Sequence, residues 1–263
     1  MAAVFLSCQY DKKNAENPGS PAQAPKEPAV ISFRINEDSV LRSYESWYDY
    51  YYYNISLSQV FKALDADSVT IGKMAFLQKL GTGNFAPFKI AQINDTPVYK
   101  LGKLISPDKN IQSTIIQLSG YEISNTQREG QTLPHYTFKD INGNIYTNSS
   151  TKGKVIWLKC WFINCVACVK EFPELNRIVE ANKSDPDVLF ISLASDSKEQ
   201  LQDFLTKRPF GFSVVPNQGN YMSDKLKLHM YPTHFLINRE GVITKVTNSE
   251  KEMLPFFNEA IKN

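Results

Sequence analysis

GKVIWLKCWFINCVACVKEFPEL, residues 153–175, joins an apolar run to a Cys-Val-Ala-Cys motif. The run 155–160 is short, apolar and β-branched at its start, which favours a buried strand. From Cys165 onward, apolar residues recur at helical spacing as far as Val179. The sequence therefore predicts that both cysteines lie where a strand gives way to a helix.

This position predicts redox chemistry for the cysteine pair. The free N–H groups and the macrodipole of a helix N-terminus favour negative charge, here a thiolate on Cys165. Such a setting lowers a thiol pKa from roughly 8.5 to about 3.5–7.5, which makes the sulfur nucleophilic at neutral pH. Cys168 is the candidate resolving thiol, because the two-residue spacer keeps the sulfurs within reach of a reversible disulfide. An inert structural disulfide is the alternative.

The stretches GKVIWLKCWFINCVACVKEFPELN and YPTHFLINREGVI resemble the thioredoxin-like thiol-disulfide oxidoreductases of the TlpA and ResA type, a redoxin group related to AhpC/TSA. The resemblance runs from about Gly130 to the C-terminus. It implies an α/β fold with a mixed sheet flanked by helices, a helix kink at Pro173 and a cis-proline at Pro232 facing the cysteines. It also implies that Glu171 is the glutamate that ResA-type proteins keep behind the thiols.

Lys159, six residues before Cys165, stands where thioredoxin keeps a buried acid. Because a buried lysine is either neutral or paired, we expect an ion pair with Glu171 beneath the disulfide. This pair is expected to favour the thiolate and to feed protons to Cys168. The alternative is that the lysine extends to the surface.

The residues around the cysteines depart from the family pattern. Asn164 replaces the usual tryptophan, and the Val166-Ala167 spacer lacks the usual proline. Spacer residues tune the reduction potential, so the direction of catalysis stays open, although the resemblance implies reduction. The candidate catalytic residues are Cys165, Cys168, Glu171, Pro232 and Lys159.

Further polar residues are weaker candidates. His234 follows Pro232 closely enough to approach the site, although strand alternation could turn it away. Asp196 ends a predicted strand, where it either serves the site or caps the next helix. His135 and His229 are expected at the surface.

Composition excludes several classes of function. The 263 residues carry a net charge of +2, which gives no footprint for nucleic acid or an anionic membrane. No apolar run approaches the roughly 18 residues of a membrane span. Cys8 and Cys160 supply no second ligand pair, so we expect no zinc and no other cofactor. Cys160 is expected to be a small buried hydrophobe.

The N-terminus, residues 1–28, resembles the end of a bacterial lipoprotein signal followed by a polar tether. In MAAVFLSC, Cys8 would be the lipidated residue, and this predicts a location in the cell envelope or periplasm. The apolar part is shorter than a full signal core, so a disordered terminus with one free cysteine is the alternative.

Residues 29–127 are predicted to form a small α+β accessory domain. Asp65–Leu80 has partly helical spacing, and the segments 88–93, 97–104 and 111–118 are predicted to be extended. The aromatic cluster Trp47–Tyr53 either packs in a core or between domains, or forms a partner platform.

Residues 128–263 are predicted to form the redox domain. A hairpin is expected around Asn142-Gly143, because Asn-Gly favours tight turns. Strands are predicted at 188–194, 233–237 and 242–246, a short extended segment at 212–215, and helices at 196–207, 224–228 and 250–261.

Two functions follow from this organisation. The first is a thiol-disulfide oxidoreductase that exchanges electrons with envelope protein thiols and disulfides and is served by an unidentified thiol electron donor. A thiol peroxidase is disfavoured, because no threonine stands two or three residues before an isolated cysteine. The alternative is a binding module that captures an envelope ligand or partner, with the thioredoxin-like domain as scaffold.

Overall fold

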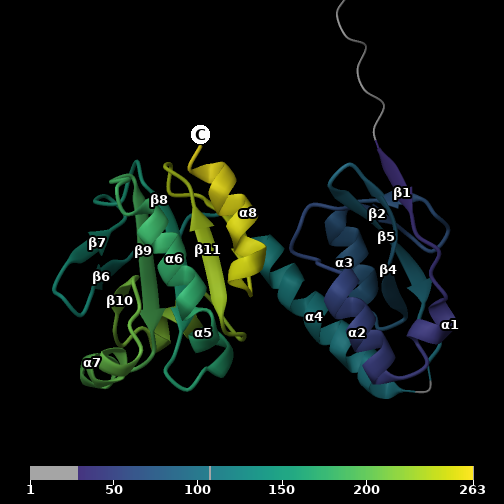
Figure 1. Ribbon diagram of the computed structural model, residues 1–263, viewed down its shortest axis with the longest axis horizontal. Helices are drawn as coiled ribbons and strands as arrows, with labels where there is room; N and C mark the ends of the chain where they lie inside the picture. Colours follow the sequence, from purple (N-terminus) through teal and green to yellow (C-terminus); the bar gives the residue numbers. More distant parts are fainter. Residues whose placement is uncertain (1–28, 107, 263) are drawn as a thin grey trace, which may run out of the picture.

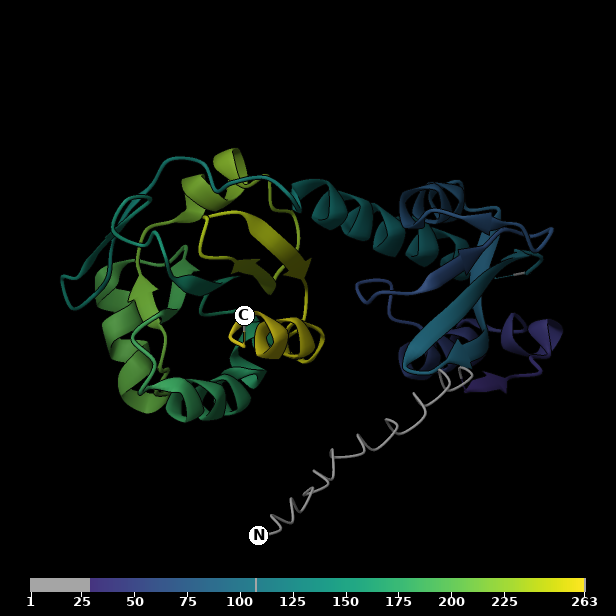
Figure 2. The same ribbon diagram turned by 90° about the horizontal axis from the view of Figure 1, so that it is seen from above.

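The computed structural model describes residues 29–106 and 108–262, which form two bodies, each built on a five-stranded β-sheet with its own core (Figures 1 and 2). Helix α4, Lys109–Arg128, runs from one body to the other. The predicted division between residues 127 and 128 falls at the end of this helix and stays a prediction. Cys8 and the predicted tether lie outside the described residues.

The N-terminal body is a mixed five-stranded sheet with helices packed against it. The strand order is β1-β4-β5-β2-β3. The strands are β1 Val30–Ser32, β2 Lys62–Leu64, β3 Thr70–Ile71, β4 Phe85–Ile93 and β5 Thr96–Lys103, and the helices besides α4 are α1 Glu37–Val40, α2 Tyr44–Asn54 and α3 Lys73–Gly81. Its core includes Trp47, Phe76, Leu77, Leu80, Phe88, Leu101, Ile111 and Ile115.

The predicted extended segment at 111–118 is wrong, because these residues lie in helix α4. Asp108 caps the helix by accepting a hydrogen bond from the N–H of Asn110 at 2.9 Å. Ile111 and Ile115, four residues apart, are both buried on one face of the helix. The apolar residues of this segment follow the helical period.

The aromatic cluster divides between the core and the surface because it lies on helix α2. Trp47 is 1% exposed and packs in the core, whereas Tyr48, Tyr52 and Tyr53 are 44%, 64% and 79% exposed. The predicted packing therefore holds for one face of the helix, and the other face presents tyrosines to solvent.

The C-terminal body has the mixed sheet and flanking helices that the sequence predicted. Its strand order is β10-β9-β8-β11-β12, with β8, β9 and β10 parallel and β11 antiparallel to both of its neighbours. The strands are β8 Val155–Trp161, β9 Val188–Ala194, β10 Ser213–Val215, β11 Thr233–Ile237 and β12 Ile243–Thr247, with a separate hairpin of β6 Thr137–Lys139 and β7 Ile145–Thr147. The helical segments are α5 Val166–Lys170, α6 Phe172–Asn182, α7 Lys198–Lys207, the π-helical turn η1 Tyr221–Lys225 and α8 Glu250–Ala260.

The predicted helix at 224–228 was placed too far along the chain, because the helical turn occupies Tyr221–Lys225. Its buried anchor is Met222, which lies before the predicted segment. Lys227 has a φ of 52°, a left-handed conformation that ends helical structure.

The central strand β8 is buried on both faces, and its alternation assigns each side chain to one layer. Val155 and Trp157 pack with helices α6 and α8, whereas Ile156, Leu158 and Cys160 pack with the β6-β7 hairpin and η1. Lys159 follows Trp157 by two residues and so faces the helices. The sequence of β8 thus places a lysine under the helical layer.

We expect Phe257→Ala to destabilise the protein by about 3–5 kcal/mol, the range for removing a buried aromatic ring. Phe257 is fully buried on α8, with its ring centroid 5.0 Å from that of Trp157. Its neighbour Phe256, half-buried and 4.9 Å from the Lys245 ammonium, is the matched control and should cost less when changed to alanine. Urea unfolding followed by tryptophan fluorescence measures both; equal losses would contradict the assignment of the core.

Candidate active site

Cys165 and Cys168 form a disulfide at the N-terminus of helix α5, with their Cα atoms 5.2 Å apart. Cys165 is the N-cap residue, and its sulfur accepts a hydrogen bond from the N–H of Cys168 at 3.2 Å. Cys165 is 8% exposed and Cys168 is completely buried. The pair is therefore asymmetric: of the two cysteines Cys165 alone retains exposed surface, and it lies where backbone donors favour a thiolate.

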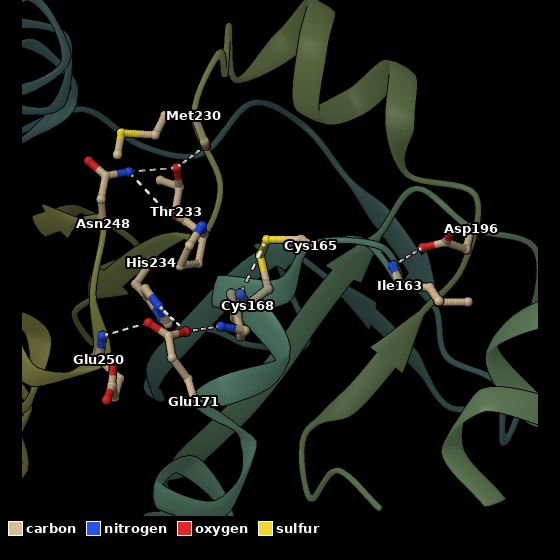
Figure 3. The surroundings of a disulfide bond; sticks show 12 residues. Ile163, Cys165, Cys168, Glu171, Asp196, Met230, Thr233, His234, Asn248 and Glu250 are labelled. Carbon is tan, nitrogen blue, oxygen red and sulfur yellow. Dashed lines mark hydrogen bonds and ion pairs between the residues drawn. A yellow bond between two sulfur atoms is a disulfide. The ribbon is translucent and has the colours of Figure 1, made fainter. Parts of the chain in front are cut away.

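The segment that leads into the motif is held by Asp196. Its Oδ2 accepts a hydrogen bond from the N–H of Ile163 at 2.9 Å, on the opposite side of the disulfide from Glu171 (Figure 3). The N-cap of α7 is Ser197, which forms a capping box with Gln200. Asp196 thus supports the active-site loop, and its neighbour caps the helix.

Glu171 is positioned by the break between helices α5 and α6. It is the residue between them, and Pro173 follows in the first turn of α6, where a missing N–H costs no helical hydrogen bond. The break turns the Glu171 side chain beneath the disulfide, where it is 8% exposed. The predicted kink at Pro173 is confirmed.

A row of polar side chains crosses the sheet beneath the disulfide. Lys159 pairs with Ser192 on one side and with His234 on the other, and His234 pairs in turn with Thr247. Directly paired residues share a face of the sheet, and all four side chains are completely buried. An otherwise apolar layer therefore contains one polar line at the level of the site.

The predicted ion pair between Lys159 and Glu171 is confirmed, because the Lys159 Nζ contacts Glu171 Oε2. The alternative of a lysine that extends to the surface is wrong, since Lys159 is completely buried. Burial lowers the pKa of the Lys159 ammonium, although the carboxylates of Glu171 and Glu250 oppose that shift.

The carboxylate of Glu171 has further donors. His234 Nε2 lies 3.1 Å from Oε2, and the backbone N–H of Glu250 donates to Oε1 at 3.2 Å (Figure 3). Burial alone would raise the pKa of Glu171, but the hydrogen bond from His234 and then the charge of Lys159 hold that pKa well below its usual range. Glu171 is therefore ionised at neutral pH.

Two titratable groups beside this pair have pKa values shifted by burial. Burial, and next the Lys159 charge, lower the pKa of His234, so its imidazole is neutral at neutral pH. Burial, together with the neighbouring Glu171 carboxyl, raises the pKa of Glu250 at the start of α8. His234 belongs to the site even though the sequence left its direction open, because direction depends on the register between β11 and β8.

The peptide bond between Tyr231 and Pro232 is cis, as the resemblance implied. Tyr231 packs against the cluster that contains both cysteines, and its ring lies edge-on to that of Phe162 at 5.5 Å. Asn248 holds the same loop, since its Nδ2 donates to the Pro232 carbonyl at 2.9 Å. The loop therefore lies beside the disulfide, as expected for Pro232.

The remaining candidates lie away from the site. His135 and His229 are exposed, as predicted. Cys160 is completely buried on the opposite face of β8, and burial raises the pKa of its thiol. Within residues 29–106 and 108–262, no three His, Cys, Asp or Glu side chains gather as a metal ion would require, and no helix is long and apolar enough to cross a bilayer.

Residues 130–246 match the AhpC/TSA family. The thiol-disulfide oxidoreductase ResA of Bacillus subtilis is 31% identical over 118 residues, which cover 45% of this chain and 66% of that protein. ResA of Halalkalibacterium halodurans is 25% identical over 137 residues, covering 51% of this chain and 78% of that protein. A crystal structure of the thioredoxin domain of a Bacteroides vulgatus thiol-disulfide oxidoreductase is 23% identical, with a TM-score of 0.45, and covers 50% of this chain and 96% of that one.

We expect Lys159→Met to destabilise the protein by about 3–5 kcal/mol, because it leaves the buried Glu171 charge without its cationic partner. Because the folded-state pKa of Glu171 is depressed, the stabilisation from its ionised form is complete above the unfolded carboxyl pKa of about 4.3. That stabilisation is lost as pH falls through the folded value, so the cost of the substitution should shrink in acid. Urea unfolding at neutral and acidic pH measures this.

The control is Lys154→Met, which breaks a solvent-exposed pair with Asp187 at 2.8 Å and should cost about 1 kcal/mol or less. The double variant Lys159→Met, Glu171→Gln should recover stability, since it removes both charges. A Lys159→Met protein as stable as the Lys154→Met protein would contradict the importance of the pair.

Proposed function

Because this chain is a ResA/TlpA-type thioredoxin-like protein, with an AhpC/TSA-family domain at residues 130–246, we propose that it is a thiol-disulfide oxidoreductase acting through Cys165 and Cys168. The observation that carries the proposal is the asymmetric disulfide at the N-terminus of α5. One sulfur caps the helix on a cysteine that is 8% exposed, and the other belongs to a cysteine that is completely buried. An attacking and a resolving cysteine require this arrangement.

The proposed reaction is a pair of thiol-disulfide exchanges. In the reductive direction, the Cys165 thiolate attacks one sulfur of a partner disulfide, forming a mixed disulfide and releasing the partner's other sulfur as a thiolate. Cys168 then loses its proton and attacks the Cys165 sulfur. This step restores the Cys165–Cys168 disulfide and releases the second partner thiolate. Both electrons come from the cysteine pair, so the exchange needs no cofactor.

The Lys159–Glu171 ion pair is proposed to favour the thiolate and to exchange protons with Cys168. The resolving cysteine is buried and therefore has no direct access to protons from water. The ion pair is buried with it and contains a lysine whose pKa is lowered by burial. Such a group exchanges protons near neutral pH more readily than a solvated lysine does.

The proposed partners are proteins, because the rim around Cys165 is largely apolar. Val166 is 68% exposed, Ala167 is exposed, and Phe162 and Tyr231 are half-buried beside them. Exposed apolar surface next to a reactive group favours contact with another macromolecule. Pro232, in the loop beside the disulfide, is proposed to shape the groove that takes the partner backbone.

We further propose that the protein acts as a reductase in the cell envelope, on the periplasmic side, with an unidentified thiol electron donor. The resemblance to ResA and TlpA proteins supports this direction. Lipidation at Cys8 is the proposed means of attachment.

A pocket of about 490 Å³ between the two bodies favours the second candidate, a ligand- or partner-binding module. Exposed tyrosines of α2, including Tyr48 and Tyr52, line it from one side, and Met230 and Asn248 line it from the redox domain. Aromatic walls with a few polar groups are typical of ligand sites. Under this alternative, Cys165→Ser leaves capture of the ligand intact.

We expect Cys165→Ser to abolish thiol exchange and Cys168→Ser to accumulate a mixed disulfide with partner proteins, because the resolving sulfur is absent. Insulin reduction measures the first effect, and non-reducing electrophoresis followed by mass analysis measures the second. Cys160→Ala is the matched control and should retain full activity, since this thiol lies on the opposite face of β8. Unchanged insulin reduction by the Cys165→Ser protein would contradict the proposed reaction.

The reduction potential of the pair tests the direction. For a reductase we expect a value near or below about −250 mV, close to that of thioredoxin. Equilibration in defined dithiol buffers, followed by alkylation and mass analysis, gives the value. A potential of about −120 to −180 mV would instead indicate an oxidase or isomerase.

A further inference from the structure

The indole of Trp157 fixes the proton arrangement of the histidine under the disulfide. Both side chains are completely buried, and Trp157 Nε1 donates to His234 Nδ1 at 3.0 Å. An indole nitrogen is only a donor, so Nδ1 must be the acceptor and carries no proton. A second proton on the imidazole would turn Nδ1 into a donor facing another donor.

The other ring nitrogen of His234 therefore carries the hydrogen. Nε2 lies 3.1 Å from Glu171 Oε2 and donates to it (Figure 3). The burial that lowers the pKa of His234 agrees with this neutral form. The ring thus acts as a fixed donor to the carboxylate rather than as a proton carrier.

Glu171 then has three donors for its two oxygens: the Lys159 ammonium, the His234 ring and the backbone N–H of Glu250. A carboxylate held by several donors keeps its charge and resists protonation. Lys159, by contrast, has Glu171 as its one hydrogen-bond partner in the described part of the chain. The transferable proton of the cluster is therefore on the lysine.

We propose that His234, held as the Nε2–H tautomer by Trp157, is a positioning residue that keeps Glu171 ionised, so that Lys159 exchanges the proton with Cys168. The proposal rests on the thiol exchange proposed above. In the resolving step, neutral Lys159 takes the proton from the Cys168 thiol and becomes an ammonium beside the Glu171 carboxylate. The resulting thiolate attacks Cys165, and the partner sulfur leaves with the electron pair of the broken bond. When the enzyme disulfide is reduced again, the ammonium returns this proton to Cys168.

The pH dependence of this step depends on the groups that face Lys159. They are Glu171 between α5 and α6, Glu250 on α8 and His234 on β11, whereas the Cys160 thiol, next on the strand, lies on the opposite face of β8. The Glu171 charge strengthens Lys159 as a base, because it stabilises the ammonium. Loss of the His234 donor should make Glu171 easier to protonate, so that it stabilises the Lys159 ammonium less. The apparent pKa of the resolving step should then fall, and the step should slow at neutral pH.

The test separates attack by Cys165 from resolution by Cys168. Reduced protein is mixed with an aromatic disulfide reagent, and the release of its two thiolate equivalents is followed across pH. His234→Leu should slow the second release about tenfold at neutral pH and shift its profile to lower pH, since it removes a hydrogen bond to a charged group; tenfold corresponds to about 1.4 kcal/mol. His234→Gln has both a donor and an acceptor in its amide, so it should stay within about threefold of the parent.

A superimposable profile for His234→Leu, or equal slowing by leucine and glutamine, would assign His234 a packing role only and overturn the proposal. Trp157→Phe retains an aromatic ring and removes the indole donor, so it should slow the second release in the same direction even if the leucine variant does not fold. A parent protein that never releases the second equivalent would contradict the proposed function itself.

The tautomer is measured on the unaltered protein. Long-range proton–nitrogen correlation spectra should show His234 neutral, with its hydrogen on Nε2, at neutral pH. The protein has three histidines, and His234→Gln identifies the signal. A doubly protonated or Nδ1–H ring would overturn the proposal even if thiol exchange is found.

Discussion

The site depends on the burial of one ammonium group in the centre of a sheet. Lys159 stands on the middle strand β8, completely buried, where an unpaired charge costs several kcal/mol. The cost is offset only if a carboxylate reaches it and that carboxylate is itself hydrogen-bonded. Neighbouring elements meet this need: the break between α5 and α6 supplies Glu171, strand β11 supplies His234, and the start of α8 supplies a backbone N–H. The pairing of one lysine thus fixes the placement of four elements around the disulfide.

Much of this arrangement could be predicted because it depends on local sequence. The apolar run of β8, the cysteine spacing and Pro173 define a strand, a helix start and a helix break within about twenty residues of chain. Burial of Lys159 was expected because it stands where thioredoxin keeps a buried acid, and the resemblance to ResA-type proteins implied Glu171 as the carboxylate behind the thiols. These predictions required no knowledge of the partner strands.

The role of His234 could not be predicted in the same way, because it depends on register. His234 faces Lys159 only because β11 pairs with β8 in the observed antiparallel register, and a shift of one residue would turn the ring to the other face. The misassigned segment 111–118 failed for a different reason. Its apolar residues suit either a strand or a helix over so short a length, and the cap at Asp108 together with burial of Ile111 and Ile115 decided for the helix.

The amide of Asn248 links helix α4 to the loop beside the disulfide. Asn248 donates to the Pro232 carbonyl and to Thr233 Oγ1, and its own oxygen accepts a hydrogen bond from Asn125 on α4 at 2.8 Å. The loop beside the disulfide is therefore tied to the helix that leads to the second sheet. A thioredoxin-like domain needs no such tie for its own fold, since its core closes without α4. The connection therefore fixes the geometry of the loop beside the disulfide from outside the domain. Asn248, which holds this loop, and Met230, which precedes it, also line the tyrosine-lined pocket.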